Sequence, residues 1–251
     1  MNIDATIQAR LGSSRLPGKV LAPILGRPLI EYQIERIRRS KIINRVVIAT
    51  TTNPQDDAIA DLAQRLGCEC FRGSGDDVIG RVLGSLNQFD IEVNAEFQGD
   101  NPIPDPQLID HVIGYYLDHC DQFDYVTNSL KTTYPPGLEV SVYSRAVLAD
   151  AEARIVEPLL REHVGIHIYR HPEIYRVKNL EAPPEFTRPN LHLEVDTHED
   201  LDFVSAIYEH FMPTNPEFSL ADLISYIDMN PHLALGNEKV ERRWRQYRND
   251  D

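Results

Sequence analysis

The hydrophobic residues in about the first 120 positions follow two alternating spacings. Short apolar or alternating runs predict strands at residues 4–10, 45–51, 69–72 and 92–98. Between them, apolar residues recur every three to four positions, which predicts helices at residues 28–39, 54–66, 77–89 and 106–118. This β-α-β-α order predicts an α/β fold, a Rossmann-like three-layer α/β/α sandwich around a mostly parallel sheet.

After about residue 120 the alternation becomes less regular. The pattern predicts strands at residues 124–127 and 138–143, helices at 144–153 and 157–168, and a last core strand at 192–196. Helices are expected at 198–211 and 219–229, and a surface helix in the charged tail 237–248. We therefore expect a single domain over residues 1–251, with an inserted lid, acceptor or dimerisation region at about 124–190.

A glycine-containing loop follows the first predicted strand. Residues 8–19 (QARLGSSRLPGK) contain two glycines, two serines and the cations Arg10, Arg15 and Lys19. Ligands of open α/β sheets bind beyond the carboxyl ends of the strands, and backbone N–H groups beside such cations suit a polyphosphate. Five residues separate Gly12 from Gly18, so the spacing matches neither a Walker loop nor a dinucleotide fingerprint.

Two acidic residues lie at predicted strand ends that are far apart in the sequence. Asp100 follows the strand 92–98, and Asp196 ends the strand 192–196. If both strands belong to one parallel sheet, these carboxylates emerge at the same edge as the glycine loop. Mg²⁺ often binds through one or two carboxylates plus phosphate oxygens, so we expect Asp100 and Asp196 to hold it. Taken singly, each could instead cap a helix.

Composition and charge narrow the range of functions. The chain has 25 Lys and Arg against 39 Asp and Glu, a net charge of −14, which argues against binding to nucleic acid or to anionic membranes. No apolar stretch is long enough to span a bilayer. Three cysteines without metal-ligand spacing indicate reduced, mostly buried thiols in a cytoplasmic protein. A solvated helix face is expected for the basic tail residues Arg242, Arg243, Arg245 and Arg248.

Residues 7–21 (IQARLGSSRLPGKVL) resemble the signature of the cytidylyltransferases that activate acidic sugars. These are the CMP-KDO and CMP-acylneuraminate synthetases, and especially their spore-coat-polysaccharide-type relatives. The resemblance continues, in the same order, through residues 71–82 (FRGSGDDVIGRV), 97–104 (FQGDNPIP), 161–170 (REHVGIHIYR) and 195–201 (VDTHEDL). It implies a homodimeric enzyme with a glycosyltransferase-A-like nucleotidylyltransferase fold that uses CTP and Mg²⁺.

The resemblance also assigns roles to individual residues. The triphosphate would be bound by Arg10, Ser13, Arg15 and Lys19, with the backbone of Leu11 and Gly12 near the cytidine. The base or its ribose would be approached by Arg72 and Ser74, and the ribose or acceptor by Gln98. Catalysis would depend on Arg10, Lys19, Asp100 and Asp196, the two aspartates as metal ligands. His163 would face the acceptor or lie buried, and Arg161 could bind an anionic acceptor or lie on a solvated face.

The predicted reaction is transfer of CMP from CTP to an acidic sugar, an ulosonic or nonulosonic acid, or to a similar anionic acceptor. Pyrophosphate would be released, and the product would serve surface polysaccharide biosynthesis. Asn101 stands where the KDO enzymes have Glu, so the acceptor stays open. The alternatives are a sugar-1-phosphate or phosphonate nucleotidylyltransferase, and a non-catalytic nucleotide-binding scaffold.

Overall fold

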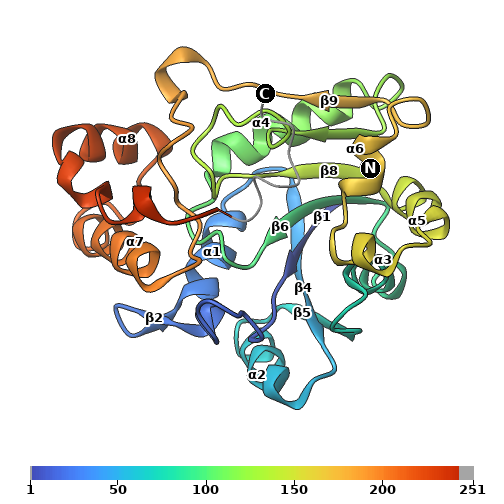
Figure 1. Ribbon diagram of the computed structural model, residues 1–251, viewed down its shortest axis with the longest axis horizontal. Coiled ribbons are helices and arrows are strands. Elements are labelled where there is room, and N and C mark those ends of the chain that lie inside the picture. The colour runs from blue at the N-terminus through green and yellow to red at the C-terminus, as the bar shows by residue number, and fades with distance from the viewer. Residues whose placement is uncertain (1, 243–251) are drawn as a thin grey trace.

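A seven-stranded sheet forms the centre of the molecule, with the strand order β5-β4-β1-β6-β8-β7-β9 (Figure 1). The computed structural model describes residues 2–242. One half of the sheet is parallel and consists of β1 (Ile3–Gln8), β4 (Ile43–Thr51), β5 (Glu69–Gly73) and β6 (Val93–Gln98). These four strands match the predicted positions to within two residues. β1, β4 and β6 are β-branched or alternating apolar runs that fill the core, whereas β5 is an edge strand whose side chains are mostly half-buried.

The other half of the sheet comes from residues after 120. It consists of β7 (Tyr125–Thr127), β8 (Ser141–Ser144) and β9 (Val177–Asn179). β8 runs antiparallel to both β6 and β7, while β9 is parallel to β7. The predicted insertion therefore continues the central sheet rather than forming a separate body, and its role as a lid or dimerisation region stays a prediction.

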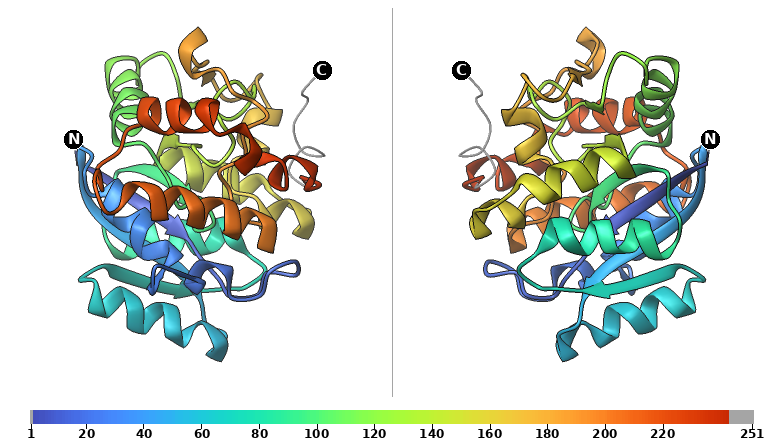
Figure 2. Two further views of the ribbon diagram at one scale, coloured as in Figure 1. Left: turned by 90° about the vertical axis from the view of Figure 1, so that its left-hand side faces the viewer. Right: turned by 90° about the vertical axis from the view of Figure 1, so that its right-hand side faces the viewer.

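Helices cover both faces of the sheet, which confirms the predicted three-layer α/β/α sandwich (Figure 2). One face packs against α1 (Leu29–Ile37), α2 (Asp57–Arg65), α4 (Pro106–Asp118), α7 (His198–Phe211) and α8 (Leu220–Met229). The opposite face packs against α3 (Val78–Gln88), α5 (Arg145–Arg154) and α6 (Ile166–Arg170). None of the helices within residues 2–242 is long and apolar enough to cross a bilayer.

Short elements connect this framework. A hairpin of β2 (Pro23–Ile24) and β3 (Arg27–Pro28) follows the glycine loop. The 3₁₀ turns are η1 (Lys19–Leu21), η2 (Pro54–Asp56), η3 (Pro158–Glu162), η4 (Pro184–Phe186), η5 (Pro231–Ala234) and η6 (Asn237–Lys239).

The predicted helix at residues 157–168 is wrong. The segment forms η3, then an extended residue at His163, and only then the short helix α6. At the break lies Gly165, where a Cβ would lie 2.6 Å from the hydroxyl oxygen of Tyr125, so only glycine allows the chain to pass this close to that side chain. The chain therefore approaches β7 closely here instead of continuing as a helix.

The predicted core strand at residues 192–196 is also wrong. Leu193 and Val195 are fully buried, which gives the segment its strand-like alternation. Their N–H groups, however, donate to the carbonyl oxygens of Pro136 (2.6 Å) and Asp100 (2.9 Å), neither of which lies in the sheet. The segment is an extended chain packed against two loops, so its position was set by tertiary contacts and not by strand pairing.

Two smaller expectations also need correction. The predicted tail helix is wrong within the described residues, where only the turn η6 forms, and Arg242 is buried rather than solvated. The other tail arginines, Arg243, Arg245 and Arg248, lie outside the described residues. The cysteines are free thiols as predicted, but Cys68 and Cys70 are only half-buried and Cys120 is exposed.

Candidate active site

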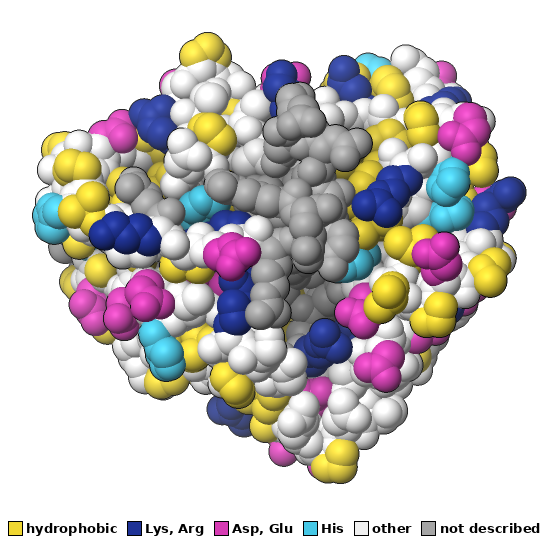
Figure 3. Space-filling model, viewed as in Figure 1, with side chains coloured by type: hydrophobic (Ala, Val, Ile, Leu, Met, Phe, Trp, Pro, Cys, Tyr) yellow, Lys and Arg dark blue, Asp and Glu magenta, His cyan; other side chains and the backbone are white. Residues whose placement is uncertain are grey.

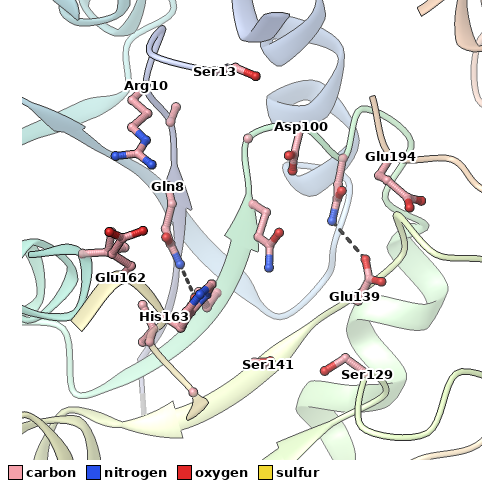
Figure 4. Close-up of a pocket in the computed structure, with 18 of the residues that line it drawn as sticks. Gln8, Arg10, Ser13, Asp100, Ser129, Glu139, Ser141, Glu162, His163 and Glu194 are labelled. Atoms are coloured by element: carbon pink, nitrogen blue, oxygen red, sulfur yellow. Dashed lines mark hydrogen bonds between the residues drawn. The ribbon is translucent and has the colours of Figure 1, made fainter. Parts of the chain in front are cut away.

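A cavity of about 610 Å³ opens at the carboxyl ends of β1 and β6 (Figure 4). Arg10 and Ser13 lie on one side of it, in the loop that follows β1. Ser129, Glu139 and Ser141 lie on the opposite side, on and around β8. We call the first side the nucleotide wall and the second the acceptor wall, after the ligands that the resemblance leads us to expect there. Glu96 lies on β6, between β1 and β8 in the sheet, and is counted with the acceptor wall.

A buried carboxylate fixes the nucleotide-wall loop. Asp56 is fully buried, and it accepts hydrogen bonds from the Thr51 hydroxyl and from the backbone N–H of Leu11 at 2.7 Å. The N–H of Gly18 donates to the carbonyl oxygen of Leu11 at 2.9 Å, which closes the loop and starts η1 at Lys19. The loop is thus tied to the end of β4, and the Lys19 ammonium is directed into the cavity.

Lys19 joins the two predicted aspartates. Its Nζ lies 2.6 Å from Asp100 Oδ2 and 2.9 Å from Asp196 Oδ1. Arg15 adds a second cation, with Nη2 2.5 Å from Asp196 Oδ2. Burial alone would lower the pKa of Lys19, but the two carboxylates outweigh it and raise that pKa. Burial would raise the pKa of Asp196, yet Lys19, Arg15 and Arg242 hold it below its usual value.

Close backbone packing places Asp100. A Cβ on Gly99 would lie 2.7 Å from the carbonyl oxygen of Gln8, so only glycine lets β6 end so near to β1. The N–H of Gly99 donates to that same carbonyl oxygen at 2.8 Å. Asp100 therefore emerges directly beside the end of the first strand, as the sequence predicted.

The start of α7 places Asp196. Asp200 accepts hydrogen bonds from the N–H groups of Asp196 (2.8 Å) and Thr197 (3.0 Å), and Thr197 forms a capping box with Asp200. Arg242 then holds Asp200 through two hydrogen bonds, at 2.7 and 3.0 Å. The side chains of both Arg242 and Asp200 are fully buried, so this ion pair fixes the backbone of Asp196 from the interior of the protein.

The acceptor wall carries an isolated carboxylate on β6. Glu96 accepts hydrogen bonds from the Gln8 side-chain amide and from the Tyr143 hydroxyl. Burial raises the pKa of Glu96 to about 7, and these two neutral donors only partly offset it. Glu96 lies two residues before Gln98 on the same strand, and both side chains line the cavity.

The rest of the acceptor wall is rich in hydroxyl, amide and carboxylate groups. Asn101 donates to Glu139 Oε2 at 3.1 Å (Figure 4). Ser129 and Ser141 both lie within hydrogen-bond distance of the Thr127 hydroxyl. His163 lines the cavity, and burial lowers its pKa, so its imidazole is neutral at pH 7. Such a wall suits a polyhydroxylated ligand.

Four of the predicted site residues do not line the cavity: Leu11, Arg72, Ser74 and Arg161. Arg72 pairs with Asp57 (2.7 Å) and donates to the carbonyl oxygen of Thr51. Arg161 pairs with Asp77 (2.8 Å) and with Glu152. The other assigned residues line the cavity, namely Arg10, Gly12, Ser13, Arg15, Lys19, Gln98, Asp100, His163 and Asp196.

Several residues at the site were not predicted from the sequence. Glu96 could have been found, because strand periodicity places it on the same face as Gln98. Asp200 was signalled by its capping-box spacing from Thr197. Arg81 lines the cavity, with a pKa lowered to about 10 by burial and by the nearby Arg10, but on sequence alone it was indistinguishable from a surface residue. No local pattern pointed to the burial of Arg242.

The donor set at Asp100 and Asp196 fits a hard divalent cation. Asp100 Oδ1 is buried and has no hydrogen-bond partner, so one carboxylate oxygen is left for a ligand. No group of three or more His, Cys, Asp or Glu side chains in the described part of the chain could hold a metal alone. Mg²⁺ fits two carboxylates because it commonly completes its shell with phosphate oxygens and water.

Comparison with known proteins identifies the family. A family model described as cytidylyltransferase matches residues 5–227. The chain is 34% identical to the spore coat polysaccharide biosynthesis protein SpsF of Bacillus subtilis over 92% of this chain and 96% of that protein. It is 31% identical to the 8-amino-3,8-dideoxy-manno-octulosonate cytidylyltransferase of Shewanella woodyi, over 70% and 74% of the two chains.

A solved structure agrees with the sequence match. The cytidylyltransferase of Leptospira borgpetersenii superposes with a TM-score of 0.88 at 28% identity, covering 96% of this chain and all of that one. The fold of the present chain is thus the α/β nucleotidylyltransferase fold. This chain belongs to the cytidylyltransferase family and is a CTP-dependent nucleotidyltransferase.

Proposed function

We propose that the enzyme uses Mg²⁺ to transfer CMP from CTP to an acidic sugar or similar anionic acceptor, releasing pyrophosphate, in surface polysaccharide biosynthesis. One observation carries this proposal. Asp100 and Asp196, 96 positions apart in the sequence, converge on Lys19 beside the cationic loop that follows β1. Carboxylates that face a triphosphate-binding loop would repel the nucleotide unless a cation lies between them.

The chain's own residues would act by positioning and by neutralising charge. An oxygen of the acceptor would attack the α-phosphorus of CTP in line, and a hydroxyl nucleophile would lose its proton to solvent. The bond between the α-phosphorus and the oxygen that bridges to the β-phosphorus breaks, and pyrophosphate leaves. Arg10, Arg15 and Lys19 would bind the phosphate oxygens and stabilise the negative charge on the leaving group. Asp100 and Asp196 would hold Mg²⁺, which when bound neutralises phosphate charge and can lower the pKa of a coordinated oxygen.

The relatives support an acidic sugar as the acceptor class. The Shewanella woodyi protein is named for an amino-octulosonate, and the Bacillus subtilis protein for spore coat polysaccharide biosynthesis. Gln98 and His163 line the cavity and would contact such an acceptor. The predicted homodimer is a further proposal, which light scattering of the purified protein would test.

The decisive test is product analysis. We expect CTP and a sugar acid from a panel of ulosonic and nonulosonic acids to give a CMP-sugar by mass spectrometry and stoichiometric pyrophosphate. The reaction should require Mg²⁺ and should proceed poorly with ATP, GTP and UTP. Sugar-1-phosphates and phosphonates belong in the same panel, and exclusive use of one of these would contradict the proposed acceptor class.

A further inference from the structure

Glu96 is the feature of the cavity that the transfer reaction does not explain. Its carboxylate lines the cavity, yet the two hydrogen bonds it accepts come from neutral groups, Gln8 and Tyr143. Among residues 2–242, no Lys, Arg or His side chain forms an ion pair with it. Glu96 is half-buried, and a carboxylate withdrawn from water without a cationic partner is costly, so its presence at a ligand-binding surface calls for a role in binding.

The carboxylate is also held in a fixed orientation. The Tyr143 hydroxyl donates to Glu96 and accepts a hydrogen bond from Asn94 Nδ2 at 3.0 Å. The same Asn94 amide donates to the Thr6 hydroxyl at 2.9 Å, and all three of these residues are fully buried. An ionised carboxylate has about four acceptor positions, of which two are used here. The others are available to a ligand in the cavity.

The charges that line the cavity favour different chemical groups at the two ends of an acceptor. Arg10, Arg15 and Lys19 line the nucleotide wall and would attract the acid group of a sugar acid. In its ionised form, Glu96 would repel that acid group, because like charges at short range disfavour each other. An acceptor that spans the cavity must therefore present a different kind of group to Glu96.

We propose that Glu96 binds a protonated amine of the acceptor, so that the acceptor is an amino-sugar acid with its ammonium group at Glu96. This inference rests on the proposed function and narrows its substrate class. A neutral hydroxyl could fill the hydrogen-bonding positions, but only a cation also compensates the charge. Because burial raises the pKa of Glu96 to about 7, a bound ammonium would also favour the ionised carboxylate.

Matched acceptors test the proposal. Sugar acids of eight and nine carbons would be offered in sets that differ at one carbon only, carrying a hydroxyl, a free amine or an N-acetylated amine. Steady-state pyrophosphate release from CTP gives kcat/KM for each. We expect a free-amine acceptor to exceed its hydroxyl and N-acetyl partners by about tenfold or more, since a charge-assisted hydrogen bond contributes about 1.5–3 kcal/mol.

The variant Glu96→Gln separates specificity from general damage. It keeps the shape of the side chain but removes the charge, so the amine preference should fall below about twofold while KM for CTP stays unchanged. Glu92→Gln, an exposed position just before β6, is the matched control and should keep the preference. A wild-type enzyme that prefers the hydroxyl or N-acetyl form, or a preference that survives in Glu96→Gln, would overturn the inference. If no sugar acid of the panel supports pyrophosphate release, the proposed function itself fails, which is a different result.

Discussion

The two walls of the cavity differ in charge and in the way the chain builds them. The nucleotide wall presents cations from one continuous loop, and these are compensated by carboxylates that reach across from other segments. The acceptor wall presents hydroxyl, amide and carboxylate groups from β6, β8 and the segment before α6. A triphosphate needs the same cations whatever the acceptor is. Under the proposed function, specificity for the acceptor would therefore come from the second wall.

On one face of the molecule, the charges of the described side chains are mixed. On the face seen in Figure 3, described Lys and Arg side chains stand among Asp and Glu side chains and form no continuous basic surface. With a net charge of −14, long-range attraction of an anionic nucleotide is weak. Under the proposed function, recognition of CTP would then depend on the few cations inside the cavity, so substitutions of these cations and of their ion-pair partners test the proposal.

The largest expected effect is a loss of folding stability when Arg242 is replaced. Arg242 binds Asp200, which in turn binds the backbone of Asp196. Arg242→Ala would leave buried carboxylates uncompensated, which typically costs about 3–5 kcal/mol of folding free energy. Urea unfolding should show this loss. Lys239→Ala, an exposed neighbour, is the control and should change stability little. Arg242→Lys should recover only part of the folding free energy lost in Arg242→Ala, because lysine cannot reproduce the two hydrogen bonds to Asp200. Equal stability of Arg242→Ala and Lys239→Ala would show that the pair is not structural.

The next largest expected effect is a loss of turnover when one of the two converging aspartates, Asp100, is replaced. Asp100→Asn should lower turnover roughly 10²–10³-fold, about 2.7–4 kcal/mol, by analogy with the removal of other charge-stabilising groups. Pyrophosphate release from CTP measures the change, and Asp61→Asn on the exposed side of α2 serves as the control. A melting temperature close to wild type would show that the loss is chemical. Turnover at the wild-type rate would contradict the assignment of Asp100 to the metal.

These two sites also show what the sequence could and could not predict. The nucleotide wall follows from local patterns: Gly99-Asp100 ends a periodic strand, and the loop to Lys19 follows another. Asp196 was placed correctly for an incorrect reason, since residues 192–196 form no strand and reach the cavity through contacts with Pro136 and Asp100. Single-sequence periodicity reports burial on one side of a segment, but not which partner buries it. After residue 120, the helices α5, α7 and α8 match their predicted positions to within one residue, whereas the segments 157–168 and 192–196, which depend on tertiary contacts, do not.

A third and smaller expected effect is a pH dependence of the unfolding free energy, which would show whether Glu96 lacks a counter-charge. Its pKa is raised from 4.5 in the unfolded chain to about 7 in the fold, so the folded state binds the extra proton between these values. Stability of the wild type should therefore fall, relative to Glu96→Gln, as pH rises from about 4.5 to 7, by up to about 3 kcal/mol. Urea unfolding of both proteins at pH 5 and pH 8 measures the difference. A difference independent of pH would mean that Glu96 is compensated, and Glu92→Gln controls for loss of an exposed charge.

The smallest effect concerns Lys19, whose ammonium lies between the two proposed metal ligands at 2.6 and 2.9 Å. Without nucleotide, this ammonium and a divalent cation compete for the same carboxylates. Lys19→Met removes the competitor, so the nucleotide-free protein should bind Mn²⁺ at least about tenfold more tightly, ~1.4 kcal/mol, in a titration followed by electron paramagnetic resonance. Lys41→Met, at an exposed position, should leave the affinity unchanged. Turnover should nevertheless fall, because Lys19 would also bind the triphosphate. Unchanged or weaker Mn²⁺ binding would mean that Lys19 holds the aspartates together rather than excluding the metal, and the nucleotide wall would then need its lysine before any metal could bind.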